Sequence, residues 1–248
     1  MKIRDAGDRA LVVEFGDVID PGLVARVRQL DQRVHAALSS DPEGPLAGVV
    51  ETVPTFRSLA LVLDPLRTSP DTVAEALAAL VDDAIDADLT ATRSWELPVN
   101  YGGDNGPDLD DVARHSGLDR EEVIARHVDL AVSVYLLGFM PGFAFLGNTD
   151  PALHLPRRTE PRVRVPAGSV GLALTLTAIY PWQSPGGWHL IGHSPVPLFD
   201  ADRSPAALLS PGDRVYFKAV EDDEHAHLLD AVQHGQIAAD AWLKGTAL

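Results

Sequence analysis

The first ninety residues show two different spacings of apolar positions. Runs of β-favouring residues predict strands at 10–15, 48–53 and 58–63. Apolar residues three or four apart predict helices that begin at Asp20-Pro21 and Ser69-Pro70, where a capping side chain precedes a proline. The apolar stripes of these helices are Leu23, Val27, Leu30 and Val34, and then Val73, Leu77, Leu80, Val81 and Ala84. The pattern predicts a small α/β domain with the order β-β-α-β-β-α.

Shorter strands follow an acidic stretch at 82–93, where we place a domain boundary. A strand at 95–99 leads into a glycine-rich turn and two short helices. Asp108 is placed to cap the first helix, and Asp119 with Glu122 resembles a capping box for the second. Later strands are predicted at 132–137, 163–165, 169–176, 188–191, 197–199 and 214–217. Many short strands separated by glycine and proline predict a closed barrel or a sandwich.

The whole chain is therefore expected to be an α+β protein with two domains and a tail. Residues 1–90 form the α/β domain, and residues 91–220 form the barrel or sandwich. Residues 221–248 form an acidic tail, which Leu228, Leu229 and Val232 mark as helical.

The amino-acid composition limits the classes of partner that the chain can bind. With 36 acidic and 20 basic residues among 248, the formal charge is −16. Nucleic acids and anionic membrane surfaces both require a broad basic face, so we exclude them. The absence of cysteine excludes disulfides and thiolate chemistry. The N-terminus lacks the apolar segment of a signal peptide, and no apolar run approaches the ~20 residues that span a bilayer. We expect a cytoplasmic protein.

An arginine cluster lies inside the glycine- and proline-rich stretch at 137–188. This stretch contains four arginines and two acidic residues, in contrast to the acidic chain as a whole. The four are Arg157, Arg158, Arg162 and Arg164. Arg162 and Arg164 alternate on a predicted strand and so share one face, and a converging pair of guanidinium groups holds a carboxylate or phosphate. The alternative is a solvated strand edge or an ion pair with Glu160.

The sequence Ser184-Pro-Gly-Gly187 is typical of a tight turn. It carries one hydroxyl and consecutive glycine amides, which stabilise an oxyanion or bind phosphate oxygens in other proteins. The alternative is a hairpin turn with Trp188 buried behind it. Phe139, Met140, Pro141 and Phe143 belong either to the core or, with Trp188, to a pocket wall.

Several strong motifs are missing, and the histidines do not form a metal motif. The chain has no GxxxxGK[ST] phosphate loop, no GxGxxG, no HExxH and no GxSxG elbow. His225 and His227 are two apart on a predicted helix, where side chains diverge, so we expect no metal site. His127 and His193 are candidate general bases, but a lone histidine is more often a hydrogen-bonded structural residue.

Long motifs, taken together, resemble one known family. They are GFMPGFAFLG at 138–147, PRVRVPAGSVG at 161–171, IYP at 179–181, SPGGWHLIG at 184–192, TFRSLALVLDP at 55–65 and LPVNYGGDNGPDLDDVA at 97–113. The family is allophanate hydrolase subunit 1, which includes the B-type component of prokaryotic 5-oxoprolinase (PxpB) and the kinase inhibitor KipI. The resemblance covers roughly residues 1–220.

The resemblance implies a fold, partners and an activity. The fold is a small α/β domain followed by a cyclophilin-like β-barrel. The partners are a second subunit (allophanate hydrolase subunit 2, the C-type component of 5-oxoprolinase) and a third, A-type component. Such assemblies open 5-oxoproline to glutamate with ATP and Mg, which this chain would bind itself or share with a partner; no intrinsic cofactor is expected. The alternative from the same family is a non-catalytic KipI-type inhibitor of a sensor histidine kinase.

The family positions and side-chain chemistry together give roles for the site residues. Arg157, Arg158, Arg162, Arg164 and Ser169 would bind the substrate carboxylate or a phosphorylated intermediate. Ser184 and the amides of Gly186 and Gly187 would lie at the oxyanion, and Tyr180 and His193 would transfer protons.

The chain also departs from the family pattern. It has Leu174, Leu176 and Ala178 where glycine, glutamine and glycine are expected, and His193 where the family has arginine. Leucine lacks the amide donors of glutamine, and histidine carries only a titratable charge.

Overall fold

The computed structural model describes residues 1–81 and 93–246. The chain divides into two compact units, Met1–Leu89 and Thr90–Leu248. The boundary predicted near residue 90 lies outside the described residues. No described helix is both long and apolar enough to cross a bilayer.

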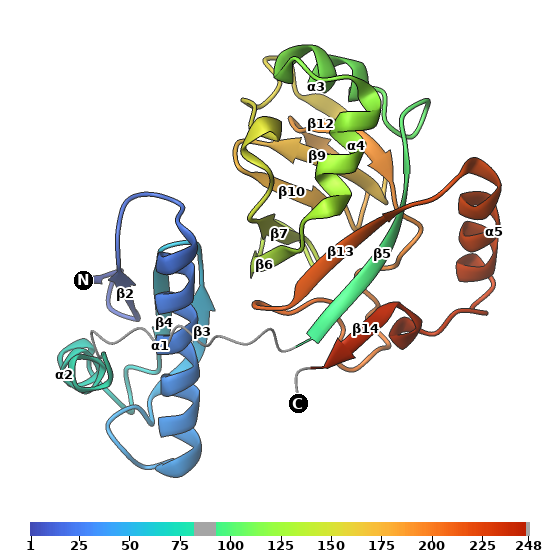
Figure 1. Ribbon diagram of the computed structural model, residues 1–248. Coiled ribbons are helices and arrows are strands. Elements are labelled where there is room, and N and C mark those ends of the chain that lie inside the picture. The colour runs from blue at the N-terminus through green and yellow to red at the C-terminus, as the bar shows by residue number, and fades with distance from the viewer. Residues whose placement is uncertain (82–92, 247–248) are drawn as a thin grey trace. The chain divides into compact units, whose positions relative to one another are not determined.

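The first unit is an antiparallel sheet with the strand order β1-β2-β4-β3 and two helices (Figure 1). Its elements are β1 (Lys2–Asp5), β2 (Ala10–Glu14), α1 (Pro21–Ser40), β3 (Val49–Pro54), β4 (Ser58–Leu63) and α2 (Pro70–Leu80). This sequence of elements confirms the predicted order β-β-α-β-β-α, although no residue range was predicted for β1. Alternate residues of β4, including Leu59, Leu61 and Leu63, are fully buried in the core of this unit.

Both helices of the first unit begin where the sequence predicts. The Asp20 carboxylate accepts hydrogen bonds from the backbone amides of Gly22 and Leu23, and the Ser69 hydroxyl accepts one from Thr72. In α1 the buried stripe matches the prediction, except that Val24 rather than Leu23 is buried. In α2 Val73 and Leu77 are buried, whereas Leu80 and Val81 are only half-buried. The predicted stripe residue Ala84 lies outside the described residues. Each fully buried valine or leucine contributes about 1.5–3 kcal/mol of transfer free energy.

The second unit is a closed β-barrel, which confirms the predicted α+β class with a C-terminal barrel. The strands around the barrel are β12 (His189–His193), β9 (Ser169–Ala173), β10 (Leu176–Ile179), β7 (Ala144–Gly147), β6 (Val132–Leu137), β13 (Arg214–Ala219) and β5 (Arg93–Tyr101). Pairing of Gly192 with Tyr101 joins β12 to β5 and closes the ring. β13 runs parallel to β5, while the other pairs around the ring are antiparallel.

Two predicted strands differ from the observed ones. Residues 169–176 were expected to be one strand, but β9 and β10 are separate and pair as a hairpin, with Leu176 opposite Ala173. The chain reverses at Leu174, which has a φ of 56°. The predicted strand at 197–199 is reduced to an isolated bridge between Phe199 and Ala207.

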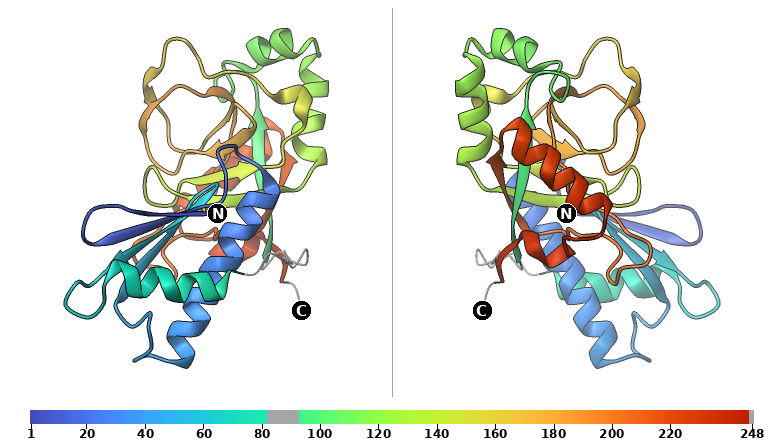
Figure 2. Two further views of the ribbon diagram at one scale, coloured as in Figure 1. Left: turned by 90° about the vertical axis from the view of Figure 1, so that its left-hand side faces the viewer. Right: turned by 90° about the vertical axis from the view of Figure 1, so that its right-hand side faces the viewer.

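Helices and short elements cover the barrel. α3 (Leu109–Ser116) and α4 (Arg120–Asp129) lie side by side, with α3 against β12 and α4 against β13 (Figures 1 and 2). The predicted capping box of α4, Asp119 with Glu122, is present. Helix α5 (Asp222–Gln233) contacts β5, and β14 (Leu243–Thr246) extends the sheet at β5. A two-stranded ribbon of β8 (Arg162–Val165) and β11 (Ser184–Gly186) and the short 3-10 turns η1 (Pro151–Leu153) and η2 (Ala239–Trp242) complete the unit.

Candidate functional site

A pocket of about 350 Å³ lies in the barrel unit and gathers many of the predicted site residues. Its lining consists of Phe139, Phe143, Phe145, Arg157, Arg158, Pro161, Tyr180, Pro185, Gly186, Gly187 and Trp188. The lining comes from the loop between β6 and β7, from β7 itself, from the segment before β8, and from the chain between the end of β10 and the start of β12. Segments up to fifty residues apart in sequence therefore build one cavity, of a size that suits a small organic ligand.

The aromatic wall of the pocket is organised around Phe143. Its ring is almost fully buried and packs edge-on against Phe139 at 5.4 Å, Tyr180 at 5.3 Å and Trp188 at 6.0 Å between ring centroids. Phe145 packs on Phe143 at 4.9 Å. Edge-to-face packing fixes the orientation of each ring. The result is a preformed apolar surface on which a flat ligand ring can lie.

Tyr180 supplies the polar hydroxyl of this wall. Burial raises the pKa of Tyr180 to about 12, although the charges of Arg157 and Arg162 and the backbone amide of Trp188 act in the opposite direction. The hydroxyl therefore keeps its proton at neutral pH and is available as a hydrogen-bond donor. The position of this hydroxyl also explains why residue 186 is glycine, because a Cβ there would lie 2.5 Å from the Tyr180 oxygen.

The Ser184–Gly187 segment is not the tight turn that its composition predicts. Ser184–Gly186 is the strand β11, paired with β8 through Ser184 opposite Val165 and Gly186 opposite Arg162. Gly187 then accepts a backbone hydrogen bond from Arg158 at 2.8 Å. Gly186 and Gly187 line the pocket, whereas Ser184 does not, and its hydroxyl contacts the carbonyl of Pro185.

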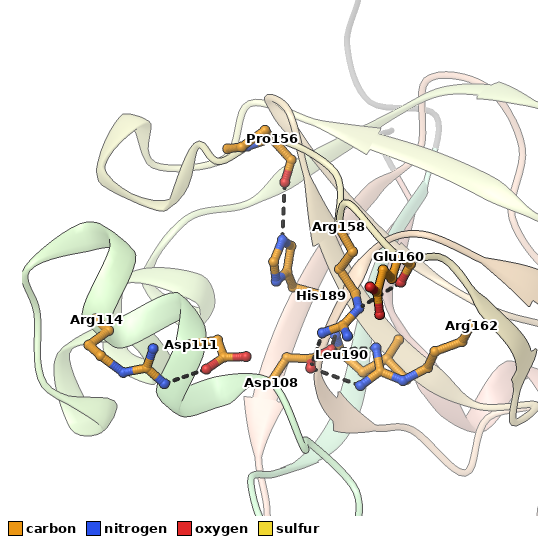
Figure 3. Close-up of polar contacts among 9 residues, drawn as sticks. All are labelled: Asp108, Asp111, Arg114, Pro156, Arg158, Glu160, Arg162, His189 and Leu190. Carbon is orange, nitrogen blue, oxygen red and sulfur yellow. Dashed lines mark hydrogen bonds and ion pairs between the residues drawn. The ribbon is translucent and has the colours of Figure 1, made fainter.

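Two of the predicted anion-binding arginines converge on a carboxylate of the chain itself (Figure 3). Arg162 donates two hydrogen bonds to Asp108, at 2.7 and 2.8 Å, and Arg158 donates one at 2.7 Å. The ion-pair alternative is therefore correct in kind, but the partner is Asp108. Glu160 contacts Arg158 through its backbone carbonyl, at 3.4 Å. Arg158 also lines the pocket, so it joins the cavity to this ion-pair cluster.

Asp108 was predicted to cap a helix, and its position agrees with this prediction but its side-chain contacts do not. It stands at the N-cap position of α3, but its side chain makes no cap hydrogen bond and instead also accepts the amide of Leu190 at 2.7 Å. Burial alone would raise the pKa of Asp108. The hydrogen bonds from Arg162 and Leu190 and the charges of both arginines outweigh burial and lower this pKa below its usual 3.8. Asp108 is thus a buried, ionised carboxylate.

His127 lies in the barrel core, in a chain of neutral hydrogen bonds. The Thr177 hydroxyl donates to the carbonyl of Gly171, so it accepts from Nε2 of His127 at 2.9 Å. Nδ1 then accepts from the Tyr101 hydroxyl at 2.7 Å. Burial lowers the pKa of His127 to about 3 and raises that of Tyr101 well above 10.0. This arrangement matches the structural interpretation of His127 rather than the general-base one.

His193 lies outside the pocket lining and contacts helix α5. Its Nε2 donates to the carbonyl of Ala167 at 3.0 Å, which leaves Nδ1 to accept from Nε2 of His225 at 2.8 Å. Burial, together with the charge of His225, lowers the pKa of His193. His225, which sequence reasoning assigned to a tail without a function, is buried in this contact.

The remaining predicted residues also lie outside the lining. They are Met140, Pro141, Arg162, Arg164 and Ser169. Ser169 is buried on β9 opposite His193, and Arg164 is exposed on β8. Their predicted roles stay predictions. Pro161 and Pro185 of the lining, and Asp108 beside it, are the contributors that sequence reasoning missed. Among the described residues no group of three or more histidine and acidic side chains is arranged to hold a metal ion.

Comparison with known proteins places this architecture. Residues 1–209 match the model of the family described as carboxyltransferase domain, subdomain C and D. The chain belongs to this family. It is 38% identical over 241 residues to the B subunit of 5-oxoprolinase from Bacillus subtilis, covering 91% of this chain and 96% of that protein. It is 39% identical over 212 residues to the protein of the same name from Escherichia coli O157:H7, covering 85% and 92%. The family recognised from the motifs is confirmed.

Solved structures agree with these relatives. The crystal structure of TTHA0988 is 39% identical, with a TM-score of 0.72, over 86% of this chain. This chain spans only 40% of that longer one. The urea amidolyase of K. lactis matches 95% of this chain with a TM-score of 0.74 at 20% identity, a likeness that shows the fold alone.

Proposed function

We propose that this chain is the B-type component of a 5-oxoprolinase, which opens 5-oxoproline to glutamate together with partner subunits and ATP. The observation that carries the proposal is the pocket, which combines a preformed aromatic wall with arginines and one neutral hydroxyl donor. The near full-length likeness to proteins named as the B subunit of 5-oxoprolinase supports the choice of substrate.

5-Oxoproline presents three features that the pocket residues complement. Its flat five-membered ring would lie on the aromatic wall around Phe143. Its carboxylate would pair with Arg157, which lines the pocket from the segment before β8. Its ring carbonyl would accept a hydrogen bond from Tyr180, whose proton is retained at neutral pH.

This assignment revises the arginine roles. Arg162 donates hydrogen bonds from two guanidinium nitrogens to Asp108, and Arg158 donates one. We therefore assign the carboxylate of the substrate to Arg157. Arg158 then adds positive charge beside the ligand. Opening the ring breaks one amide bond and consumes one water, and the coupled hydrolysis of ATP to ADP and phosphate consumes a second. Because the chain lacks a phosphate-loop motif, we place ATP and Mg on a partner subunit or at a surface shared with it.

The test is a reconstituted assembly of this chain with its second and third subunits. We expect ATP hydrolysis that depends on 5-oxoproline and yields glutamate. Arg157→Ala should raise KM for 5-oxoproline by at least about tenfold, since a charge-assisted pair contributes about 1.5–3 kcal/mol. Arg67→Ala, an exposed arginine of the first unit, is the matched control and should leave KM unchanged.

A complete wild-type assembly without 5-oxoproline-dependent turnover would refute the proposal. Inhibition of histidine kinase autophosphorylation by the same chain would then favour the KipI-type alternative. Unchanged KM in Arg157→Ala, with turnover intact, would instead move the carboxylate to another residue of the pocket.

A further inference from the structure

Phe139 has an unusual backbone conformation at the pocket. The amide of Met140 donates to the carbonyl of Gly138 at 2.8 Å, so Phe139 is the central residue of a γ-turn, and its φ is 70°. This form of the γ-turn is rare and strained, and a bulky residue seldom adopts a positive φ. Strain of this kind persists only where the surroundings hold the backbone in place.

The surroundings of Phe139 do hold the turn. The amide of Gly138 donates to the carbonyl of Phe143 at 3.1 Å, and the amide of Phe143 donates to Met140 at 3.1 Å. Gly142 packs so closely that a Cβ there would lie 2.6 Å from Cβ of Phe199. The indole nitrogen of Trp182 donates to the carbonyl of Pro141 at 3.1 Å. The loop between β6 and β7 is therefore anchored on both sides of the strained residue.

Contacts of the Phe139 ring within the chain do little to offset the strain of its backbone. The ring is 66% exposed, whereas Phe143, on which it packs edge-on, is 2% exposed. Nevertheless it lines the pocket. The fold thus keeps a large apolar ring in water beside the pocket, in a backbone conformation that costs free energy. A ligand that covers the ring would supply the missing contact.

We propose that Phe139 is a ligand-contacting residue, whose ring packs on the ring of a small cyclic anion in the pocket and shields it from water. The γ-turn sets the position of the ring before the ligand arrives, which reduces the entropy lost on binding. The identification of the ligand with 5-oxoproline rests on the proposed function, but the contact itself does not. Any flat anion that enters the pocket should need this ring.

Paired substitutions separate the ring from the strain. Phe139→Ala removes the ring and keeps the strained backbone, whereas Phe139→Gly removes both. Leu174→Gly is the matched control, because Leu174 also has a positive φ, 56°, and is 46% exposed, but does not line the pocket. Both glycine variants should raise Tm by about 2–4 °C, since glycine adopts a positive φ without penalty.

Binding is measured with two probes. In the reconstituted assembly, Phe139→Ala and Phe139→Gly should raise KM for 5-oxoproline by about tenfold, and Leu174→Gly should not. With the full chain alone, the fluorescent anion anilinonaphthalene sulfonate should bind the wild type and Leu174→Gly equally and both Phe139 variants about tenfold more weakly. This second probe tests the contact even if the assembly does not act on 5-oxoproline.

Each other outcome overturns the proposal. Wild-type affinity for both probes in the Phe139 variants would show that the ring does not contact the ligand. A wild-type chain that binds neither probe would show that no such ligand enters the pocket. Unchanged probe binding with weakened assembly of the subunits would identify the exposed ring as a contact between subunits instead.

Discussion

Two polar residues of the barrel unit, Asp108 and His127, are equally buried, each with 2% exposure, yet the chain accommodates them in opposite ways. Asp108 stays ionised because Arg158 and Arg162 converge on it. His127 stays neutral in a chain with Tyr101 and Thr177. The pKa of each group is lowered, but for an acid this favours the charged form and for a base the neutral form.

The difference between Asp108 and His127 indicates which of these two buried residues is linked to function. A buried ion is tolerated only where opposite charges and hydrogen bonds offset its desolvation, and those charges are costly to position. Here the same arginine, Arg158, also lines the pocket, so the charged centre is in electrostatic contact with any ligand. The hydrogen-bonded group of His127, Tyr101 and Thr177 is neutral, so it needs only hydrogen bonds, and it contacts only the core. We therefore expect ligand effects at Asp108 and purely structural effects at His127.

The largest effect is expected from Asp108→Ala. The substitution leaves two partly buried guanidinium groups facing each other and removes the acceptor of the Leu190 amide. Breaking a buried ion pair in this way costs about 3–5 kcal/mol of the free energy of unfolding. Urea denaturation followed by circular dichroism measures the loss.

The neighbouring Asp111 provides the control for that experiment. It is on the surface of α3 and pairs with the exposed Arg114, so Asp111→Ala should change the unfolding free energy by less than about 1 kcal/mol. Equal, small losses in both variants would show that Asp108 is not the centre of a buried cluster.

A smaller effect is expected from His127→Phe. The new ring keeps the stacking position on Phe217, now 4.4 Å from His127, but removes the acceptor of the Tyr101 hydroxyl and the donor to Thr177. Leaving these buried groups unpaired should cost about 2 kcal/mol. Tyr101→Phe added to His127→Phe should restore part of the loss, because the orphaned hydroxyl is then gone. A double variant that is less stable by the full sum of the two single losses would contradict this chain of hydrogen bonds.

Local signals explain why much of the fold could be predicted from the sequence. The starts of α1 and α2 depend on a cap and a proline next to the first turn, and the capping box of α4 spans four residues. The order of elements in the first unit follows from the same local periodicities. The aromatic and glycine residues of the pocket could also be selected, because they lie within the glycine- and proline-rich stretch at 137–188.

Distant partners explain what could not be predicted. Asp108 stands at a helix start, where a cap is the usual role, and its arginine partners are 50 and 54 residues away. The segment at Ser184 has the composition of a turn, but pairing with β8 makes it a strand. The hairpin at Leu174 lacks a glycine, so no sequence signal marks the reversal between β9 and β10.

The smallest effect is a pH dependence that separates the two centres. The pKa of His127 falls from 6.5 in the unfolded chain to about 3 in the folded one, so the folded state binds fewer protons than the unfolded state between these values. Stability from this group is complete above pH 6.5 and declines as the pH falls, by up to about 1.4 kcal/mol per pH unit. Between pH 6 and pH 5 Asp108 adds almost no loss, because in that range the carboxylate is ionised both in the folded chain and in the unfolded chain, where its pKa is 3.8.

Between pH 6 and pH 5, urea denaturation should therefore show that the wild type loses about 1 kcal/mol more than His127→Phe. The lowered pKa values of His189, His193 and His225 act with the same sign, but they are present in both proteins and cancel in the difference. Parallel stability curves for the two proteins would mean that His127 is not held neutral by burial. The contrast between the charged Asp108 and the neutral His127 would then be wrong, because a protonated His127 would have to be stabilised by charge in the same way as Asp108.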